Sequence, residues 1–245
     1  LKGDFSQKEF MASLFTVMFV AVMCYVILML FKYLNKKKEG QEETGMIKNV
    51  IFDVGKVLVD FDWPEYLDSF GFDPEKRNRI AKATFQSPVW DERDRGIYEE
   101  EHYLKQFQEL DPQDAADIEK VLKDSGRTIR KRPYADTWIK YLKSRGYHVY
   151  ILSNYSSYML EHTKKELTFR KEMDGEVFSC HVKQLKPEAE IYQTLLNMYD
   201  LKADECVFID DRPENCGGAE SQGIHTICFK NFKQATAELE MLGVK

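Results

Sequence analysis

Polar residues suited to phosphate chemistry follow three short apolar runs of this sequence, and one lysine precedes a proline. They are Asp53, Ser153, Asn154, Lys186, Asp210 and Asp211. A carboxylate that attacks a phosphate dianion meets like-charge repulsion, which a divalent cation and a lysine offset. A hydroxyl and free backbone N–H groups after a strand can hold phosphate oxygens. Because oxygen-only ligands favour Mg²⁺, these residue types together indicate metal-assisted phosphoryl transfer.

The elements that must position these residues are predicted to alternate between strands and helices. The predicted strands are Ile47–Phe52, Val149–Leu152, Cys206–Ile209 and, with weaker patterns, Val177–Ser179 and Ile224–Cys228. The predicted helices between and after them are Pro133–Arg145, Pro187–Tyr199 and Asn231–Leu242. This alternation predicts an α/β fold with a doubly wound parallel sheet. Ligands bind at the carboxyl ends of the strands of such a sheet, so the polar residues are expected to converge there.

One insertion breaks the alternation after Asp62. Asp73-Pro74 and Asp111-Pro112 are typical helix starts, with an N-cap followed by proline. Apolar stripes at helical spacing follow them: Tyr103, Leu104 and Phe107, then Ala115, Ile118 and Leu122. We therefore expect a helical subdomain at residues 63–129, inserted into a core domain of residues 46–62 and 130–245.

The N-terminal segment differs from the rest. The run from Met11 to Phe31 contains no charged residue, and as a helix it would be about 31 Å long, close to the ~30 Å of a bilayer core. Lysines follow it directly, so a transmembrane helix at 11–31 should leave the following domain in the cytoplasm, at an inner or plasma membrane. Residues 1–45 would then be anchor and linker. The alternative is translation from Met46, which stands just before the first strand and would give a soluble cytoplasmic protein.

Charge and cysteine content exclude some functions. The net charge of -6 disfavours a nucleic-acid partner. The five cysteines show no C-x-x-C spacing, so a zinc site is not expected, and their scatter suits a reducing compartment. The sequence gives no signal for a particular oligomeric state.

Four segments together resemble the motifs of the haloacid dehalogenase (HAD) superfamily, in their usual order. The segments are NVIFDVGKV, YILSN, LKPEAEIY and VFIDDRPEN. The resemblance covers residues 47 to about 230 and implies a Rossmann-like core. The inserted helices resemble the cap that this superfamily places between its first and second motifs. Because the first motif reads D-x-G, the chain most resembles the small sugar-phosphate phosphatases of the superfamily.

The resemblance also implies roles for individual residues. Asp53 would be the nucleophile that forms an aspartyl-phosphate, and Lys186 would steady both Asp53 and the phosphate. Ser153, Asn154 and Gly55 would bind the transferring phosphate. The implied Mg²⁺ site consists of Asp53, the backbone carbonyl of Gly55, Asp210, Asp211 and Asn215.

Gly55 departs from the usual pattern. In most phosphatases of the superfamily the residue two positions after the nucleophile is also aspartate, and it protonates the leaving oxygen and then activates water. Glycine can do neither, and such general acid–base help is worth about 10²–10⁴-fold in rate. Related chains with glycine here resemble working phosphatases, so we interpret the site as active. Asp60 is one candidate for the missing acid; otherwise it is a solvated turn or edge residue.

A second candidate region for substrate contact lies in the insertion. Around Gly96 the sequence gathers Trp90, Asp91, Arg93, Arg95 and Tyr98. Arg95 before Gly96 suggests a loop that faces the substrate. A salt-bridged surface turn explains the same residues equally well.

The sequence thus predicts a Mg²⁺-dependent phosphatase for a small phosphomonoester, such as a sugar phosphate or similar metabolite. Two alternatives remain. One is a metal-free haloacid dehalogenase, which the Asp210-Asp211 pair disfavours. The other is a membrane-tethered binding module with degenerate activity, for which Gly55 is the only support.

Overall fold

The computed structural model describes residues 23, 27–29 and 46–245 of the chain. Most of the transmembrane helix predicted at 11–31 lies outside these described residues. Within them, no helix combines the length and the apolar character needed to span a bilayer. Residues 46–245 form one compact unit, and this unit carries all the predicted site residues.

A five-stranded parallel sheet lies at the centre of this unit, in the order β5-β4-β1-β6-β7. The strands are β1 (Asn49–Phe52), β4 (His148–Ser153), β5 (Gly175–Phe178), β6 (Cys206–Asp210) and β7 (His225–Cys228). Strand β1 pairs with β4 on one side and β6 on the other. The predicted parallel α/β sheet is therefore confirmed, and the strand order places β1 at the switch point.

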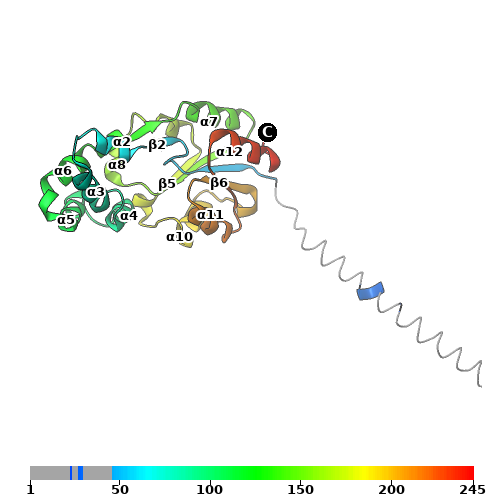
Figure 1. The fold of residues 1–245 in the computed structure, drawn as a ribbon. Helices are drawn as coiled ribbons and strands as arrows, with labels where there is room; N and C mark the ends of the chain where they lie inside the picture. Colours follow the sequence, from blue (N-terminus) through cyan, green and yellow to red (C-terminus); the bar gives the residue numbers. More distant parts are fainter. Residues whose placement is uncertain (1–22, 24–26, 30–45) are drawn as a thin grey trace, which may run out of the picture. The chain divides into compact units, whose positions relative to one another are not determined.

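Helices cover both faces of the sheet, as Figure 1 shows. Four long helices do most of this: α7 (Ala135–Ser144), α12 (Phe232–Met241), α10 (Ala189–Met198) and α11 (Pro213–Glu220). Val50 and Phe52 pack in the core cluster that includes residues of α7 and α12, whereas Ile51 packs with residues of α10 and α11. Consecutive strand residues point to opposite faces, so a strand covered on both sides reads as a continuous apolar run.

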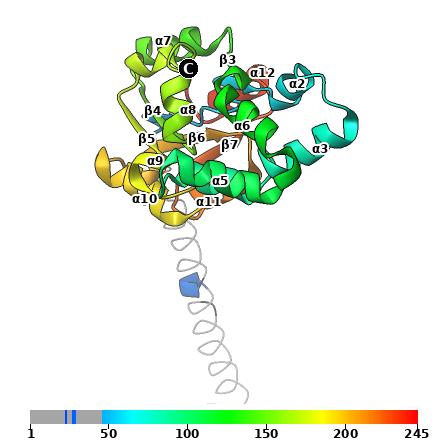
Figure 2. The same cartoon turned by 90° about the vertical axis from the view of Figure 1, so that its left-hand side faces the viewer.

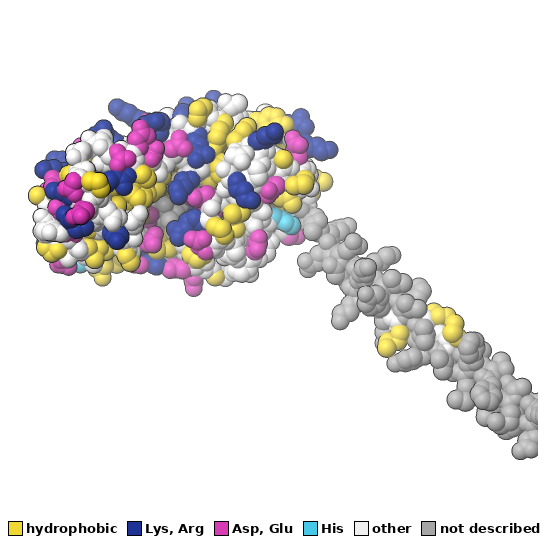
Figure 3. All heavy atoms as spheres, viewed as in Figure 1, with side chains coloured by type: hydrophobic (Ala, Val, Ile, Leu, Met, Phe, Trp, Pro, Cys, Tyr) yellow, Lys and Arg dark blue, Asp and Glu magenta, His cyan; other side chains and the backbone are white. Residues whose placement is uncertain are grey.

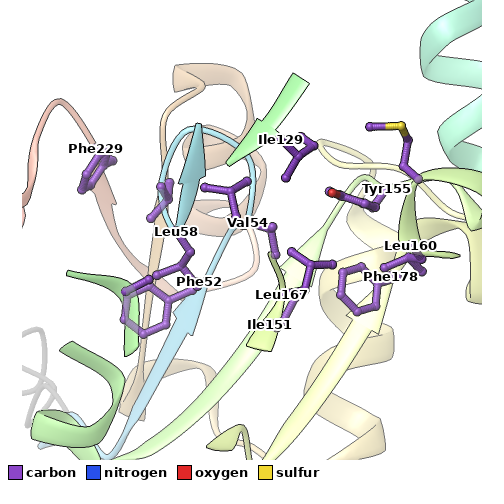
Figure 4. Close-up of a cluster of buried hydrophobic side chains, with 14 of the residues drawn as sticks. Phe52, Val54, Leu58, Ile129, Ile151, Tyr155, Leu160, Leu167, Phe178 and Phe229 are labelled. Carbon is purple, nitrogen blue, oxygen red and sulfur yellow. The ribbon is translucent and has the colours of Figure 1, made fainter. Parts of the chain in front are cut away.

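The core on the α7 side continues toward the site. Phe52 meets Trp138 edge to face, with ring centroids 4.9 Å apart. Figure 4 shows this cluster, in which Val54 and Leu58 extend the core beyond the end of β1. Burial of Val54 and Leu58 fixes the path of the chain just after Asp53. This packing matters for function because Asp53 lies between Phe52 and Val54, which are both fully buried.

Helices fill the segment between two short strands, β2 (Val59–Phe61) and β3 (Ile129–Lys131), which pair antiparallel. We call residues 63–128 the helical insertion; Figure 2 views the molecule from this side. Its elements are α2 (Trp63–Asp68), α3 (Pro74–Ala83), α4 (Pro88–Arg95), α5 (Glu100–Leu110), η1 (Pro112–Asp114), α6 (Ala115–Lys123) and η2 (Ser125–Thr128). The remaining short helices are α8 (Ser157–His162), η3 (Thr168–Glu172), α9 (Ser179–Val182) and η4 (Ala203–Glu205).

The sequence patterns located some element ends and missed others. Asp73 caps α3 as predicted, because its side chain accepts a hydrogen bond from the Lys76 N–H. Asp111 makes no such cap bond, and a short 3-10 turn separates it from the start of α6. The β2–β3 pair was not predicted, because two three-residue strands far apart in sequence give too short a pattern.

Candidate active site

Asp53 stands directly after β1 and is buried, with 7% of its surface exposed. Its backbone N–H continues the sheet by donating to the Ile209 carbonyl at 2.9 Å. Its Oδ1 accepts a hydrogen bond from the Ser153 hydroxyl and forms an ion pair with the Lys186 ammonium, both at 2.8 Å. The ends of β1, β4 and the segment before α10 therefore meet at one carboxylate oxygen.

Lys186 is held at this position by its backbone as well as by its charge. The Asn154 side chain donates to the Lys186 carbonyl at 3.0 Å and accepts from the Lys186 N–H at 2.9 Å. The Lys186 ammonium also lies 2.6 Å from Asp210 Oδ2. Burial alone lowers the pKa of Lys186, but Asp210 and Asp53 outweigh it and raise that pKa. Lys186 is therefore a permanent positive charge in the site.

The Asp53 carboxyl group has a pKa above its ordinary value. Burial raises its pKa to about 6, and Asp210 adds to this rise, whereas Lys186 opposes it. Without the lysine, a carboxylate so deeply buried would stay protonated over a wider pH range. With it, Asp53 is mostly ionised at neutral pH, as attack on phosphorus requires.

Asp210 ends β6 and is fully buried. Besides Lys186, its oxygens accept from the Arg212 N–H at 2.8 Å and from the Asn215 amide at 3.0 and 3.1 Å. Asp211 is less engaged, with the Lys56 ammonium 3.7 Å from its Oδ2. Burial, helped by Asp210, raises the pKa of Asp211.

This donor set fits a Mg²⁺ ion. One carboxylate oxygen from each of Asp53, Asp210 and Asp211 lies within 4.8 Å of the others. The buried Oδ1 of Asn215 has no hydrogen-bond partner among the described residues, which is costly unless a cation or another group binds there. Carboxylate, amide and carbonyl oxygens are the ligands that Mg²⁺ prefers.

A cavity of about 280 Å³ opens above these groups. Its polar lining consists of Asp53, Gly55, Lys56, Asp91, Asp94, Asn154, Lys186, Asp211, Arg212 and Asn215. Its other walls are the apolar or aromatic side chains Phe61, Phe85, Trp90, Ile129, Tyr155 and Met159. Figure 3 shows Lys and Arg side chains around a hollow between the helical insertion and the sheet, and Figure 4 shows Ile129 and Tyr155 beside each other, to the right of Val54.

Most of the predicted site residues line this cavity or contact a residue that does, but some of their contacts differ from the predicted ones. The Ser153 hydroxyl donates to Asp53, and Ser153 does not line the cavity. Asn154 does line it, although its amide group is occupied by the Lys186 backbone. Gly55 lines the cavity next to Asp53, where the resemblance places it.

Arg95 and Asp60 lie elsewhere. The Arg95 guanidinium makes two hydrogen bonds to Glu188, at 2.9 and 2.7 Å, and Arg95 is absent from the cavity lining. The expectation that Arg95 faces the substrate therefore differs from the structure, because its guanidinium pairs with the Glu188 carboxylate of the core. Asp60 pairs with Arg132 at 3.0 Å on the half-exposed edge of β2, so it does not face the cavity either.

The sequence reasoning passed over Asp94, which also lines the cavity. It is buried, and this burial raises its pKa to about 7, with Arg93 opposing the rise. Asp91 and Asp94 are three residues apart on α4, a spacing that puts both on one helix face. That spacing was a usable signal, because Trp90 and Asp91 also line the cavity.

Comparison with known proteins agrees with this geometry. The haloacid dehalogenase-like hydrolase family matches residues 47–223. The chain therefore belongs to that family, and it is a hydrolase with phosphatases among its relatives.

Two relatives are similar along most of their own length. The sesquiterpene phosphatase astK of Aspergillus oryzae is 24% identical over 196 residues, covering 80% of this chain and 96% of the relative. The D-ribitol-5-phosphate phosphatase of Bacteroides thetaiotaomicron is 23% identical, covering 80% and 98%. A third relative, mouse acyl-CoA dehydrogenase family member 10, is 28% identical over 79% of this chain, which spans only 19% of that longer protein.

Solved structures share the fold. A HAD family enzyme from Bacteroides thetaiotaomicron, crystallised with magnesium and inorganic phosphate, superposes with a TM-score of 0.58 at 23% identity. The superposition covers 75% of this chain and 94% of that enzyme. At this identity the likeness establishes the fold, and the chemistry rests on the site described above.

Proposed function

We propose that this protein is a Mg²⁺-dependent phosphatase that hydrolyses a small phosphomonoester through an aspartyl-phosphate on Asp53. The observation that carries the proposal is the position of the buried Lys186 ammonium, between Asp53 at 2.8 Å and Asp210 at 2.6 Å. A buried lysine there offsets the repulsion between a carboxylate and a phosphate dianion. Asp211 and Asn215 complete an oxygen-rich set at the same edge of the sheet.

The contacts of Asp53 assign different tasks to its two oxygens. Oδ1 is occupied by Ser153 and Lys186, so Oδ2 is the oxygen free to attack phosphorus. Attack forms an Asp53 Oδ2–phosphorus bond and breaks the bond from phosphorus to the ester oxygen. Hydrolysis of the mixed anhydride by water then returns phosphate and the free carboxylate. Mg²⁺, held by Asp53, Asp210, Asp211, Asn215 and the Gly55 carbonyl, would add positive charge for the phosphate oxygens.

The side chains that line the cavity indicate the polarity of the alcohol that leaves. Sugar phosphates were expected, and a sugar needs hydrogen-bond partners for each hydroxyl. The side chains Phe61, Phe85, Ile129 and Met159 offer none, and Trp90 offers a single indole N–H. The polar lining residues outside the metal cluster are Lys56, Asp91, Asp94, Asn154 and Arg212. We therefore propose a substrate whose alcohol is largely apolar. The relative that is a sesquiterpene phosphatase agrees with such a substrate, whereas the ribitol phosphate phosphatase supports the sugar alternative.

A series of straight-chain alkyl phosphates tests both parts of the proposal. Burying each CH₂ group contributes about 0.8 kcal/mol, or roughly fourfold, so kcat/KM should rise with chain length until the cavity is filled. Ribose and ribitol phosphates of equal size should react more slowly. Phosphate release should require Mg²⁺ and disappear in Asp53→Asn, which keeps the size of the side chain. A flat chain-length profile with faster sugar phosphates would reject the apolar substrate and retain the phosphatase.

The alternatives predict different products. A haloacid dehalogenase would release halide from 2-haloacids without metal, so halide should be measured in the presence of EDTA. A binding module would bind Mg²⁺ and phosphate without turnover of any ester. Phosphate release that depends on both Mg²⁺ and Asp53 excludes both alternatives.

The sequence run at 11–31 remains a proposed membrane anchor, with the phosphatase domain on the cytoplasmic side. Fractionation of cells that produce the full chain or a chain from Met46 tests it. The full chain should sediment with membranes and resist extraction by carbonate, and the shorter chain should not. Equal distribution of both would reject the anchor.

A further inference from the structure

The position of the missing acid is structurally open. A Cβ placed on Gly55 would have Asp53 Oδ2 as its nearest neighbour, at 4.0 Å, which is an ordinary contact. Packing therefore does not demand glycine there. The reaction still needs a proton for the leaving alkoxide and a base for the attacking water. Another carboxyl group that lines the cavity can supply both.

Four carboxylates line the cavity: Asp53, Asp91, Asp94 and Asp211. Asp53 and Asp211 belong to the cluster suited to a metal, where a carboxylate must stay ionised. Asp91 is exposed to solvent, so it resembles an ordinary surface carboxylate. Asp94 alone of these four is buried and lies outside the metal cluster.

Asp94 is fixed to the core although it belongs to the helical insertion. The backbone N–H of Ser156 opposes the rise in the pKa of the Asp94 carboxyl group. Its backbone carbonyl accepts from the Ser179 hydroxyl at 2.6 Å, and that hydroxyl accepts from the Tyr155 N–H at 2.9 Å. Ser179, at the start of α9, therefore holds the Asp94 backbone and links it to the loop after β4.

Two further contacts secure the end of α4. The Lys183 ammonium donates to the Gly96 carbonyl, and Arg95 pairs with Glu188. Glu188 is two residues after Lys186, so this ion pair ties the insertion to the segment that carries the site lysine. Contacts from Ser179, Lys183 and Glu188 therefore hold the part of α4 that carries Asp94.

The protonation of Asp94 suits both halves of the reaction. Burial raises its pKa to about 7; Arg93 opposes the rise, and Asp91 and Asp53 add to it. Tyr155 and Cys180 are the other titratable groups whose pKa values Asp94 raises. At neutral pH both the acid and the carboxylate are populated, which is the condition for donating and then accepting one proton.

We propose that Asp94 is the general acid and base that Gly55 lacks; this rests on the proposed phosphatase function. As Asp53 Oδ2 bonds to phosphorus and the ester bond breaks, protonated Asp94 gives its proton to the leaving oxygen and an alcohol departs. Asp94, now a carboxylate, takes a proton from water as that water attacks phosphorus. The Asp53–phosphorus bond breaks, Asp53 leaves as a carboxylate, and Asp94 is protonated again.

The test uses the dependence on the leaving group. For Asp94→Asn, kcat/KM for hexyl phosphate should fall about 10²–10⁴-fold, because an alkoxide needs the proton. For 4-nitrophenyl phosphate, whose phenolate leaves without one, kcat/KM should fall less than tenfold. An equal loss with both esters would show a structural role and overturn the proposal, as would no loss with either.

A rescue and a control complete the experiment. Gly55→Asp combined with Asp94→Asn should recover at least tenfold of the hexyl phosphate activity, because it returns an acid to the open position. Failure of that rescue would count against the proposal. Asp111→Asn, the same change at another buried carboxylate of the insertion outside the cavity lining, should leave both esters within threefold. If the parent protein released phosphate from neither ester with Mg²⁺, the proposed function would fail, and Asp94 with it.

Discussion

The Lys186 ammonium joins Asp53, at the end of β1, to Asp210, at the end of β6, with distances of 2.8 and 2.6 Å. Both carboxylates and the lysine are buried, so the site is a packed ionic group inside the protein. An ion pair of this kind is costly to desolvate and very costly to break by removing one partner. Activity and stability should therefore depend on the same lysine.

Replacing Lys186 by methionine should lower phosphate release at least 10³-fold and destabilise the fold. Two carboxylates would be left buried without their cation, and such losses cost about 3–5 kcal/mol. Urea unfolding monitored by circular dichroism at pH 8 measures the second effect. Lys164→Met removes an exposed lysine paired with Glu161 and should cost less than about 1 kcal/mol. Equal stability of the two variants would contradict this account of the site.

Asp211 should determine the affinity for Mg²⁺. Asp211→Asn removes one negative charge from the carboxylate cluster while Asp53 and Lys186 remain. Half-maximal activation should then need at least tenfold more Mg²⁺. Binding also raises the melting temperature, and a concentration of 100 Kd contributes about 2.7 kcal/mol. Thermal unfolding of the parent, Asp211→Asn and the remote control Asp204→Asn over a Mg²⁺ series, after EDTA treatment, therefore gives a second measurement. If the Mg²⁺ concentration for half-maximal activation were unchanged in Asp211→Asn, Asp211 would not be a ligand of the metal.

The Arg95–Glu188 pair should act as a tie between α4 and the core. Arg95→Met and Glu188→Gln should each lower kcat/KM about three- to tenfold, and the double variant should lose little more. A double-mutant cycle should give a coupling of about 0.5–1 kcal/mol that shrinks in 0.5 M salt.

Glu92→Gln is the matched control for this pair. Glu92 also contacts Arg95, at 3.3 Å, but from the same helix, so it cannot hold α4 to the core. The kcat/KM of the Glu92→Gln variant should equal that of the parent. A loss in Glu92→Gln as large as that in Glu188→Gln would show that only the charge of Arg95 matters.

Asp94 should make the stability of the protein depend on pH. Its pKa is raised from 3.8 to about 7, so the folded state holds a proton that the unfolded chain releases near pH 4. The stabilising contribution is complete below pH 4 and is lost as pH rises toward 7, by about 1.4 kcal/mol per unit. From pH 5 to pH 8 the parent should therefore lose ~2–3 kcal/mol of unfolding free energy relative to Asp94→Asn. Urea unfolding at four pH values measures it, and a constant difference would contradict the raised pKa.

Much of the chemistry was predictable because Asp53, Ser153 and Asp210 each follow an apolar run. Burial on both faces makes β1, β4 and β6 continuously apolar, and a parallel sheet must bring their carboxyl ends to one edge. The sequence pattern therefore predicts that Asp53, Ser153 and Asp210 lie together, as they do. Lys186 was expected at the same edge because it precedes a helix. The same reasoning misplaced Arg95, because Glu188 lies far from it in sequence and nothing local indicates that the two will pair.

The sheet, its functional edge and the residue types gathered there follow from the sequence alone, since they depend on local periodicity and on the rule that parallel strands share an end. How the helical insertion meets the core depends instead on tertiary contacts. These join α4 to Ser179 in α9 and to the segment after Lys186, across many residues of chain. Burial in this assembled packing raises the pKa of Asp94. Burial of this kind belongs to the assembled packing, because it depends on several segments at once and on no single stretch of sequence.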